Sequence, residues 1–493
     1  MNITKFISFI NEKNKTSLDA SYYTYIDLWR EYWKGNVSSF HTFKETGLDG
    51  AKHTRELFRM NMPKKACEDW ASLLLNDKTT IALGDADSEK WLFGENQVGG
   101  LLKKLNFWPN ANALVEKAFW SGTGAFVVNL RGMQIDGQNV IPSPDAEINI
   151  DYLDASCIIP LTVKHGRIVD VAFATDVMIR GQKLIYLQTH KLTNAGYVIE
   201  NEFFSCEDEK VESPVYKNIE PEGFAKRFFT SSNIPLFAIF SPAVVKNIDG
   251  GTGLGMSVFS EALYAAKQVD TTFNNYHRDF YLGGKKVFYN KKLTQGYVTK
   301  SGEEITVAPD DVQQQLFYQS DDGCDIDGKR DIYEYNPSLR VEENSKAMQD
   351  ALNYFSFKVG FGTHHYRFEH NGVKTATEYN GDRQDLVQNA NKHQTQIENA
   401  LIDVIRALLW AGKTVQGANV NIETDITINW DDSFIMDANT RRNIDKDDAL
   451  SGFIPKWKYN VQWRGMNEED AKAAVLEAQN ESGASEQLGF GDI

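Results

Sequence analysis

The sequence predicts an α+β protein in which long helices and a strand-rich layer occupy separate stretches of one chain. Apolar residues recur every three or four positions before about residue 125 and again after about residue 250. Between these stretches lie short β-branched runs separated by turn residues. The length of 493 residues exceeds that of one usual core, so we expect about two to four packing units.

The first 135 residues are predicted to be mainly helical. The opening residues MNITKFISFINEKNK favour an amphipathic helix over a signal peptide, because Asn11, Glu12 and Lys13 interrupt the apolar patch before any cleavage site. The aromatic-rich segment YYTYIDLWREYWKGN predicts a second helix that Gly35 and Asn36 can end.

The region from about 125 to 245 has a different pattern. Runs such as AFVVNL, EINIDYL, KLIYLQTH and GYVIENEFF alternate apolar and polar residues between turn signals. Because alternation with a period of two is typical of half-buried strands, the region predicts an antiparallel β-rich layer.

Two periodic segments after residue 250 predict a helical hairpin. The first, from 258 to 282, would be about 38 Å long and ends at Gly283 and Gly284. The second spans 343–359, and residues 285–335 between them carry short strand-like runs and turns. Antiparallel packing of the two helices would project this insert from the tip of the hairpin. The insert is too small and too poor in apolar residues to fold alone, so we expect partners to complete its sheet.

A loop and the longest helical signal follow the hairpin. The sequence FGTHHYRFEHNGVK at 361–374 lacks periodicity and is bracketed by glycines, which predicts a mobile loop. Periodic apolar residues then run from about Ala376 to Ala411. The tail begins with strand-like residues at 418–430 and becomes helical again near 439–450 and 467–481.

Composition excludes several classes of protein. With 42% hydrophobic and 24% charged residues, the chain is expected to fold, and its apolar runs are all interrupted by charges before they could span a bilayer. We therefore expect a soluble chain without a membrane partner. The four cysteines lie far apart without zinc-ligand spacing, which favours reduced cysteines in a protein that is made in a cytoplasm.

The formal charge of −16 argues against a protein that clamps duplex DNA, because tight binding needs clustered cations that displace phosphate counterions. A DNA-contacting role remains only where contact must be weak.

Glycines and acidic residues suggest two ligand sites, and each has a simpler explanation. The run GGTGLG at 250–255 lacks the Lys and Ser/Thr of a phosphate loop, so we interpret it as a backbone hinge before the first hairpin helix. The segment GCDIDGKRDIYE places Asp325 and Asp327 at calcium-loop positions, but Gly323 occupies the first ligand position and no helices flank it. We favour a solvated turn.

The sequence offers no catalytic centre. A metal site of His364, His365 and His370 is disfavoured against polar loop residues that face water or nucleic acid. A nucleophile elbow, a metalloprotease motif and a carboxylate pair are all absent from the sequence. We therefore expect no enzyme activity, no cofactor and no metal.

The order of helix, small insert, helix, glycine-bounded loop and very long helix resembles the portal proteins of tailed bacteriophages, in the family typified by long-tailed phages of Gram-positive hosts. The most specific local match is GVKTATE at 372–378, which leads into KHQTQIENALIDVIRALL at 392–409. Supporting matches are GxGxS at 253–257, ITINWDDSFIMD at 426–437 and the late NEEDAKAAV segment.

The resemblance implies a portal fold with long stem and wing helices, a β-rich wing layer and a small α/β clip insert. In the family's terms the regions would be a wing at 1–250, stem helix 1 at 251–283, a clip at 284–335, stem helix 2 at 336–360, a tunnel loop at 361–375, a long wing helix with returning strands at 376–436, and a crown with the C-terminal tail at 437–493.

The resemblance also implies partners and a place of action. The chain would assemble as a homo-oligomeric ring, commonly of twelve subunits, at one capsid vertex of the virion, built in the host bacterial cytoplasm. The ring would conduct double-stranded DNA without sequence specificity. It would meet the large terminase subunit during packaging, the head-completion adaptor afterwards, and the major capsid and scaffolding proteins around it.

Cations at the constriction would touch the moving DNA, whereas a mostly acidic wall would avoid trapping it. The tunnel-loop candidates are His364, His365, Arg367 and Lys374. The stem candidates are Lys267, Arg278, Lys285, Lys286 and Lys358, some of which would instead form intersubunit salt bridges.

Two other functions remain open from sequence. One is a cytosolic nucleotide-binding enzyme on a helical scaffold, which would be a monomer with a closed pocket. The other is a structural protein of the phage tail or baseplate, which would not copurify with the terminase.

Overall fold

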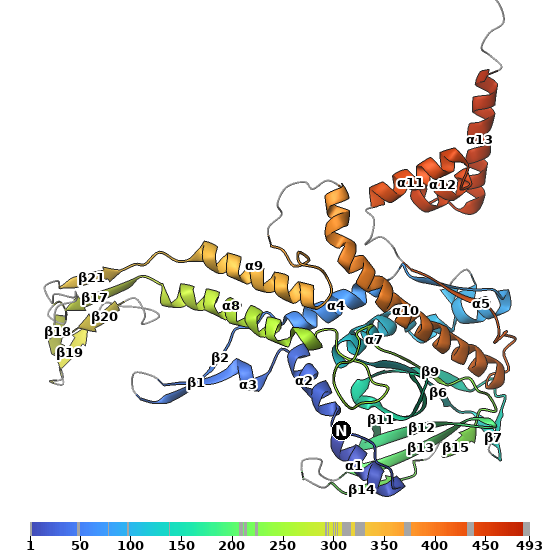
Figure 1. Ribbon diagram of the computed structural model, residues 1–493, viewed down its shortest axis with the longest axis horizontal. Coiled ribbons are helices and arrows are strands. Elements are labelled where there is room, and N and C mark those ends of the chain that lie inside the picture. The colour runs from blue at the N-terminus through green and yellow to red at the C-terminus, as the bar shows by residue number, and fades with distance from the viewer. Residues whose placement is uncertain are drawn as a thin grey trace, which may run out of the picture.

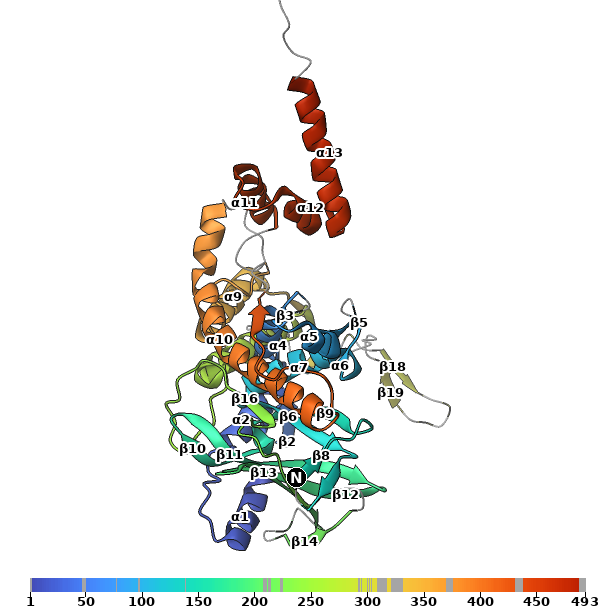
Figure 2. The ribbon, with the colours of Figure 1, turned by 90° about the vertical axis from the view of Figure 1, so that its right-hand side faces the viewer.

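The computed structural model describes residues 2–486 apart from 47–49, 77, 96–97, 138, 207–210, 212–213, 222–224, 291–292, 294, 299, 301, 303, 308–316, 321–330, 369–375 and 431–437. Helices and strands pack into one body, from which a long helical hairpin projects on one side (Figure 1). A group of C-terminal helices lies beyond the body, above it in Figure 2.

Residues 3–121 are mainly helical, as the sequence predicts, but they also contain short strands. The helices are α1 Ile3–Asn14, α2 Tyr23–Trp33, α3 Ser38–His41, α4 Met62–Leu74, α5 Ala86–Phe93, α6 Leu101–Lys104 and α7 Phe107–Ser121. The strands are β1 Thr42–Thr46, β2 Lys52–Glu56, β3 Thr80–Leu83, β4 Gly94–Glu95 and β5 Val98–Gly99.

Helix α1 is amphipathic, as predicted. The side chain of Asn2 caps it by accepting the Lys5 N–H at 3.1 Å. The buried ring of Phe6 then packs edge to face on Phe204 and Tyr216, which belong to the strand layer. The first helix therefore covers part of the sheet.

The predicted antiparallel β layer is confirmed and forms two sheets. The larger has the order β10-β11-β12-β13-β15-β8-β7 with β14 also paired to β13, and all its pairs are antiparallel except β15 with β8. The smaller has the order β16-β6-β9. The bounds are β6 Gly124–Arg131, β7 Gln134–Asp136, β8 Asn139–Ile141, β9 Glu147–Asp154, β10 Ile158–Lys164, β11 Arg167–Ile179, β12 Gln182–Thr193, β13 Gly196–Cys206, β14 Tyr216–Ile219, β15 Arg227–Phe229 and β16 Phe237–Phe240.

The two sheets share a core with α7 and with the helix after the hairpin. Phe173 and His190 of the larger sheet contact Phe237 of the smaller one, with ring centroids 5.8 and 5.3 Å apart. Helix α10, Ala376–Thr414, packs on β16 and β6, and its residues 404–411 are buried except for Arg406. This burial explains why its sequence loses polar positions toward the C-terminal end.

The hairpin consists of α8 Leu263–Leu282 and α9 Val341–Lys358. Helix α8 begins later than residue 258, because Val258 N–H and the Ser257 hydroxyl both donate to the carbonyl of Phe119 on α7. A 3₁₀ turn at Ser260–Ala262 then leads into the helix. With 20 residues, α8 is about 30 Å long rather than 38 Å.

The insert between these helices contains strands where the sequence predicts them: β17 Lys286–Asn290, β18 Gln295–Val298, β19 Glu304–Val307 and β21 Ile332–Tyr335. It also contains β20 Phe317–Ser320, which the sequence analysis does not predict. Strand β17 pairs in parallel with β20 and antiparallel with β21, while β18 pairs only with β19 among the described strands. The calcium-like residues Asp325 and Asp327 are outside the described residues, as are residues 308–316 of the insert.

The C-terminal part contains β22 Ile426–Asn429, paired with β3, and then α11 Ala438–Ser451, α12 Lys456–Arg464 and α13 Glu468–Glu486. The sequence predicts β22, α11 and α13, but not α12. Among the residues that the structure describes, no helix is long and apolar enough to cross a lipid bilayer.

Candidate functional site

The antiparallel packing predicted for the hairpin is confirmed at its tip. Asp279, near the end of α8, accepts hydrogen bonds from the backbone and guanidinium of Arg340 and from Asn344 at the start of α9. The hydrogen bond and charge of Arg340 lower the pKa of Asp279. A side chain at Gly283 would come within 2.7 Å of Leu339, so the helices meet closely where the insert begins.

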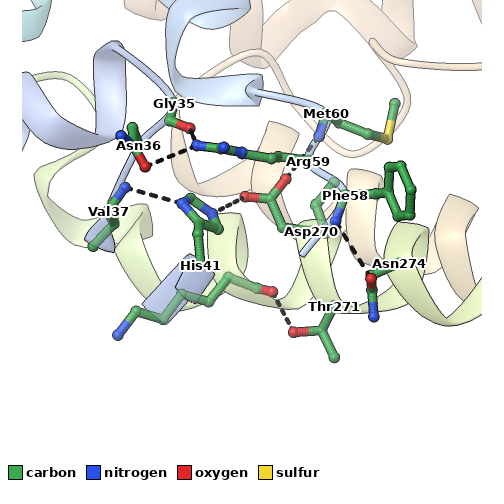
Figure 3. Close-up of polar contacts among 12 residues, drawn as sticks. Gly35, Asn36, Val37, His41, Phe58, Arg59, Met60, Asp270, Thr271 and Asn274 are labelled. Carbon is green, nitrogen blue, oxygen red and sulfur yellow. Dashed lines mark hydrogen bonds and ion pairs between the residues drawn. The ribbon is translucent and has the colours of Figure 1, made fainter. Parts of the chain in front are cut away.

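The root of α8 is joined to the body by buried polar groups (Figure 3). Val37 N–H donates to His41 Nδ1 at 2.9 Å, so the other ring nitrogen, Nε2, carries the proton that points to Asp270 Oδ2 at 3.0 Å. The second carboxylate oxygen of Asp270 accepts from Met60 N–H at 2.8 Å. His41 and Asp270 are 2% and 6% exposed. These bonds fix the direction in which α8 leaves the body.

The segment around the polar root also carries the β1–β2 hairpin. Phe58 N–H donates to Asn274 on the next turn of α8 at 3.3 Å (Figure 3). Arg59 donates to the carbonyl of Gly35 and to the Asn36 side chain. Both ends of residues 35–60 are thus held near α8, while the strands β1 and β2 between them are almost fully exposed.

The end of α9 is joined to the body by aromatic rings. The indole N–H of Trp70 on α4 donates to the carbonyl of Val359 at 3.0 Å, and its ring stacks on Phe361 with centroids 4.4 Å apart. Phe361 stacks in turn on His365 at 4.3 Å. Trp70 also contacts His393 of α10 at 4.8 Å. One buried indole therefore joins α4, the end of α9, the following loop and α10.

Two glycines turn the chain at this point. Gly360 and Gly362 have φ values of +91° and +81°, which side-chain-bearing residues rarely adopt. The carbonyl of Gly360 accepts from Asn389 of α10 at 3.0 Å. The first residues of the loop are thus held against the body more firmly than the prediction of a mobile loop implies, because Phe361 is only 3% exposed.

The predicted tunnel-loop residues lie on two sides. His364 and Arg367 line a groove of about 530 Å³ beside α9, together with Gln349 and Asp350. His365 turns away from this groove toward Phe361 and Asp69. Lys374 and His370 lie outside the described residues.

The predicted stem cations do not form one patch. Lys267 lies over the ring of Phe40 near the root of α8, whereas Lys285 pairs with Glu334 at 2.9 Å beyond its far end. Lys286 donates to the carbonyl of Leu282. Arg278 and Lys358 are exposed on α8 and α9. The structure therefore spreads these side chains along the hairpin.

The glycine-rich segment before α8 is packed against the body. A side chain at Gly251 would collide with the ring of Tyr22, and one at Gly255 with the carbonyl of Gly122. The N–H of Gly255 donates to Thr123 at 2.9 Å, and its carbonyl accepts from Tyr22. Close packing explains these glycines better than the hinge that the sequence suggests, and their backbone is engaged by protein groups.

Within the described part of the chain, His, Cys, Asp and Glu side chains form no group that could hold a metal ion.

Sequence reasoning missed Asp69, Trp70, His41 and Asp270 as residues that place the hairpin and loop. Trp70 is part of an apolar helical stripe, and the other three are isolated polar residues in the sequence. Only the fold brings them to their partners.

A comparison with protein families agrees with the resemblance to phage portal proteins. The family model described as "Phage portal protein, SPP1 Gp6-like" matches residues 12–484. A chain of the solved structure "Neck of native GTA particle computed with C12 symmetry" is similar at 10% sequence identity and a TM-score of 0.35, covering 81% of this chain and 88% of that chain. No curated protein sequence matches significantly. Since the family model spans nearly the whole sequence, this chain belongs to the SPP1 Gp6-like phage portal proteins.

Proposed function

We propose that this chain is one subunit of a ring, commonly of twelve copies, that forms the DNA channel at one vertex of a phage capsid. The observation that carries the proposal is the family match across residues 12–484, together with a helical hairpin that projects from the body. In this role the chain is structural, and the DNA passes without sequence-specific contacts. The sequence resemblance further favours a long-tailed phage of a Gram-positive host.

The regions of the subunit would divide this work. The body containing the two sheets and α10 would be the wing, and α8 with α9 would be the stem. The strands β17–β21 would be the clip, the residues that follow α9 the tunnel loop, and α11–α13 the crown. The described geometry suits this division, because the insert stands at the hairpin's tip, far from the C-terminal helices (Figure 1).

The charge of the chain suits a conduit. A ring of subunits that each carry a formal charge of −16 presents a mostly repulsive surface to a polyanion, so DNA would slide instead of binding. His364 and Arg367, which share one groove, would supply weak contacts at the constriction. The scattered positions of Lys267, Arg278, Lys285, Lys286 and Lys358 suit brief contacts spread along a stem.

The clip would dock the large terminase subunit during packaging and the head-completion adaptor later. Strands β18 and β19 pair only with each other among the described strands, which leaves edges for a partner. Deleting residues 285–335 should therefore abolish terminase binding. Unchanged binding would refute this role for the insert.

The direct test is negative-stain electron microscopy of the purified chain. The proposal predicts class averages of a closed ring with a central hole. A monomer with a closed pocket would instead favour an enzyme, and a ring that never copurifies with the terminase would favour a tail or baseplate protein.

A further inference from the structure

We propose that Asp69 and Trp70 on α4 form a seat that sets the position of the loop after α9, and that Asp69 acts on it as a positioning residue through Tyr366. The meaning of the loop for DNA passage rests on the proposed function. The seat itself follows from contacts among described residues.

The apolar half of the seat is a continuous stack. Trp70 lies against Phe361 with an angle of 18° between their rings, and Phe361 lies against His365 with an angle of 11°. Trp70 is fully buried and also contacts the rings of Phe119 and His393. The stack therefore extends from the core of the body into the loop.

The polar half of the seat is centred on Asp69. Tyr366 donates its hydroxyl to Asp69 Oδ2 at 3.0 Å, and His365 Nε2 lies 4.0 Å from the same oxygen. Gln349 on α9 donates to the Tyr366 carbonyl at 2.7 Å. Burial and the nearby Asp69 carboxylate raise the pKa of Tyr366, so the phenol remains a proton donor across the working pH range.

The seat separates the loop's side chains into two sets. Phe361, His365 and Tyr366 face α4, whereas His364 and Arg367 line the groove beside α9. Neighbouring residues of the loop point to opposite sides. The side chains that contact α4 therefore determine which cations face the groove beside α9. Asp69 thus governs the position of His364 and Arg367 by holding their neighbours His365 and Tyr366.

The test compares assembled rings of Asp69→Ala and Tyr366→Phe with the unaltered protein. Amide hydrogen exchange of the peptide covering 361–368 should become about tenfold faster in both variants, because each loses a hydrogen bond to a charged group. Lys65→Ala is the matched control, since it removes a cationic partner of Asp69 and leaves the Tyr366 bond intact. Its exchange should remain within about twofold of the unaltered ring.

Unchanged exchange in Tyr366→Phe rings would overturn the seat, and so would an equal acceleration in the Lys65→Ala control. DNA retention in particles built with each variant separates this inference from the proposed function. Faster exchange with reduced retention supports both. Faster exchange with normal retention keeps the seat and refutes the loop's role in the channel.

Discussion

The hairpin is joined to the body by two different kinds of contact. The root of α8 is held by a buried histidine, a buried carboxylate and backbone N–H groups, with His41 and Asp270 at the centre. The end of α9 is held by stacked rings around Trp70. Hydrogen bonds depend steeply on direction, whereas apolar burial depends mainly on area. The polar joint therefore fixes the angle of the hairpin, and the aromatic joint contributes more of the free energy of folding.

The largest expected effect comes from breaking the aromatic joint. Trp70→Ala should lower the free energy of unfolding by about 3–5 kcal/mol, because it opens a cavity among α4, α9 and α10. Urea unfolding measures this, and Trp70→Phe should lose clearly less. A loss under about 1 kcal/mol would show that Trp70 does not join these elements.

The aromatic joint should also become less stable in acid. Burial lowers the pKa of His393, beside Trp70, from its usual 6.5 to about 3. The unfolded chain therefore takes up the proton first. Above about pH 6.5 His393 is neutral in both states and does not affect the free energy of unfolding. Below that pH the free energy of unfolding falls by about 1.4 kcal/mol for each pH unit toward pH 3.

Urea unfolding of the unaltered protein and of His393→Asn at pH 8, 6 and 5 tests the titration. The variant keeps an acceptor near the Ala243 N–H but cannot titrate, so its stability should fall less from pH 8 to pH 5. His190 has a pKa lowered in the same way by burial, so a residual slope is expected. If the free energy of unfolding fell equally with pH in the two proteins, His393 would not be the cause of the acid destabilisation.

Breaking the polar joint should lower the free energy of unfolding less than breaking the aromatic joint, but it should change the direction of α8 more. Asp270→Asn should lower the free energy of unfolding by about 2 kcal/mol, because the amide has a single oxygen and can accept from only one of the donors His41 and Met60. Spin labels on α8 and the body, measured by electron resonance, should show a broader distance distribution. A narrow, unshifted distribution would contradict the angular role of this joint.

The smallest effect belongs to the far end of the hairpin, away from both joints. Lys285→Ala removes an exposed pair with Glu334 and should change the free energy of unfolding by less than about 1 kcal/mol. A larger loss by urea unfolding would mean that the tip also contributes to the hairpin's stability.

Local patterns predicted most of the helices and strands, because the spacing of apolar residues that marks each of them lies within a short stretch of sequence. The apolar spacing of α9 and α10 and the alternation in β11–β13 are visible in any short window. Strands β1 and β2 escaped prediction because TFKET and KHTRE show no apolar alternation, and their pairing alone makes them strands. The short α12, with few buried residues, offered equally little signal.

The candidate site could be predicted only in part. The glycines around residue 361 indicated a loop, but not that Phe361 would be buried beneath it. The contacts that place the loop and hairpin join residues far apart in sequence: Trp70 lies 289 positions from Val359, and His41 lies 229 positions from Asp270. A single sequence carries no signal for such pairs before the chain has folded.

In the proposed ring, the hairpins and their loops line the channel. A three-dimensional electron-microscopy reconstruction of the purified ring tests this arrangement. We expect α8–α9 hairpins side by side around a central hole, with the side of the loop that carries His364 and Arg367 facing the lumen. A ring whose hairpins point outward, or whose loops lie on its outer surface, would contradict it.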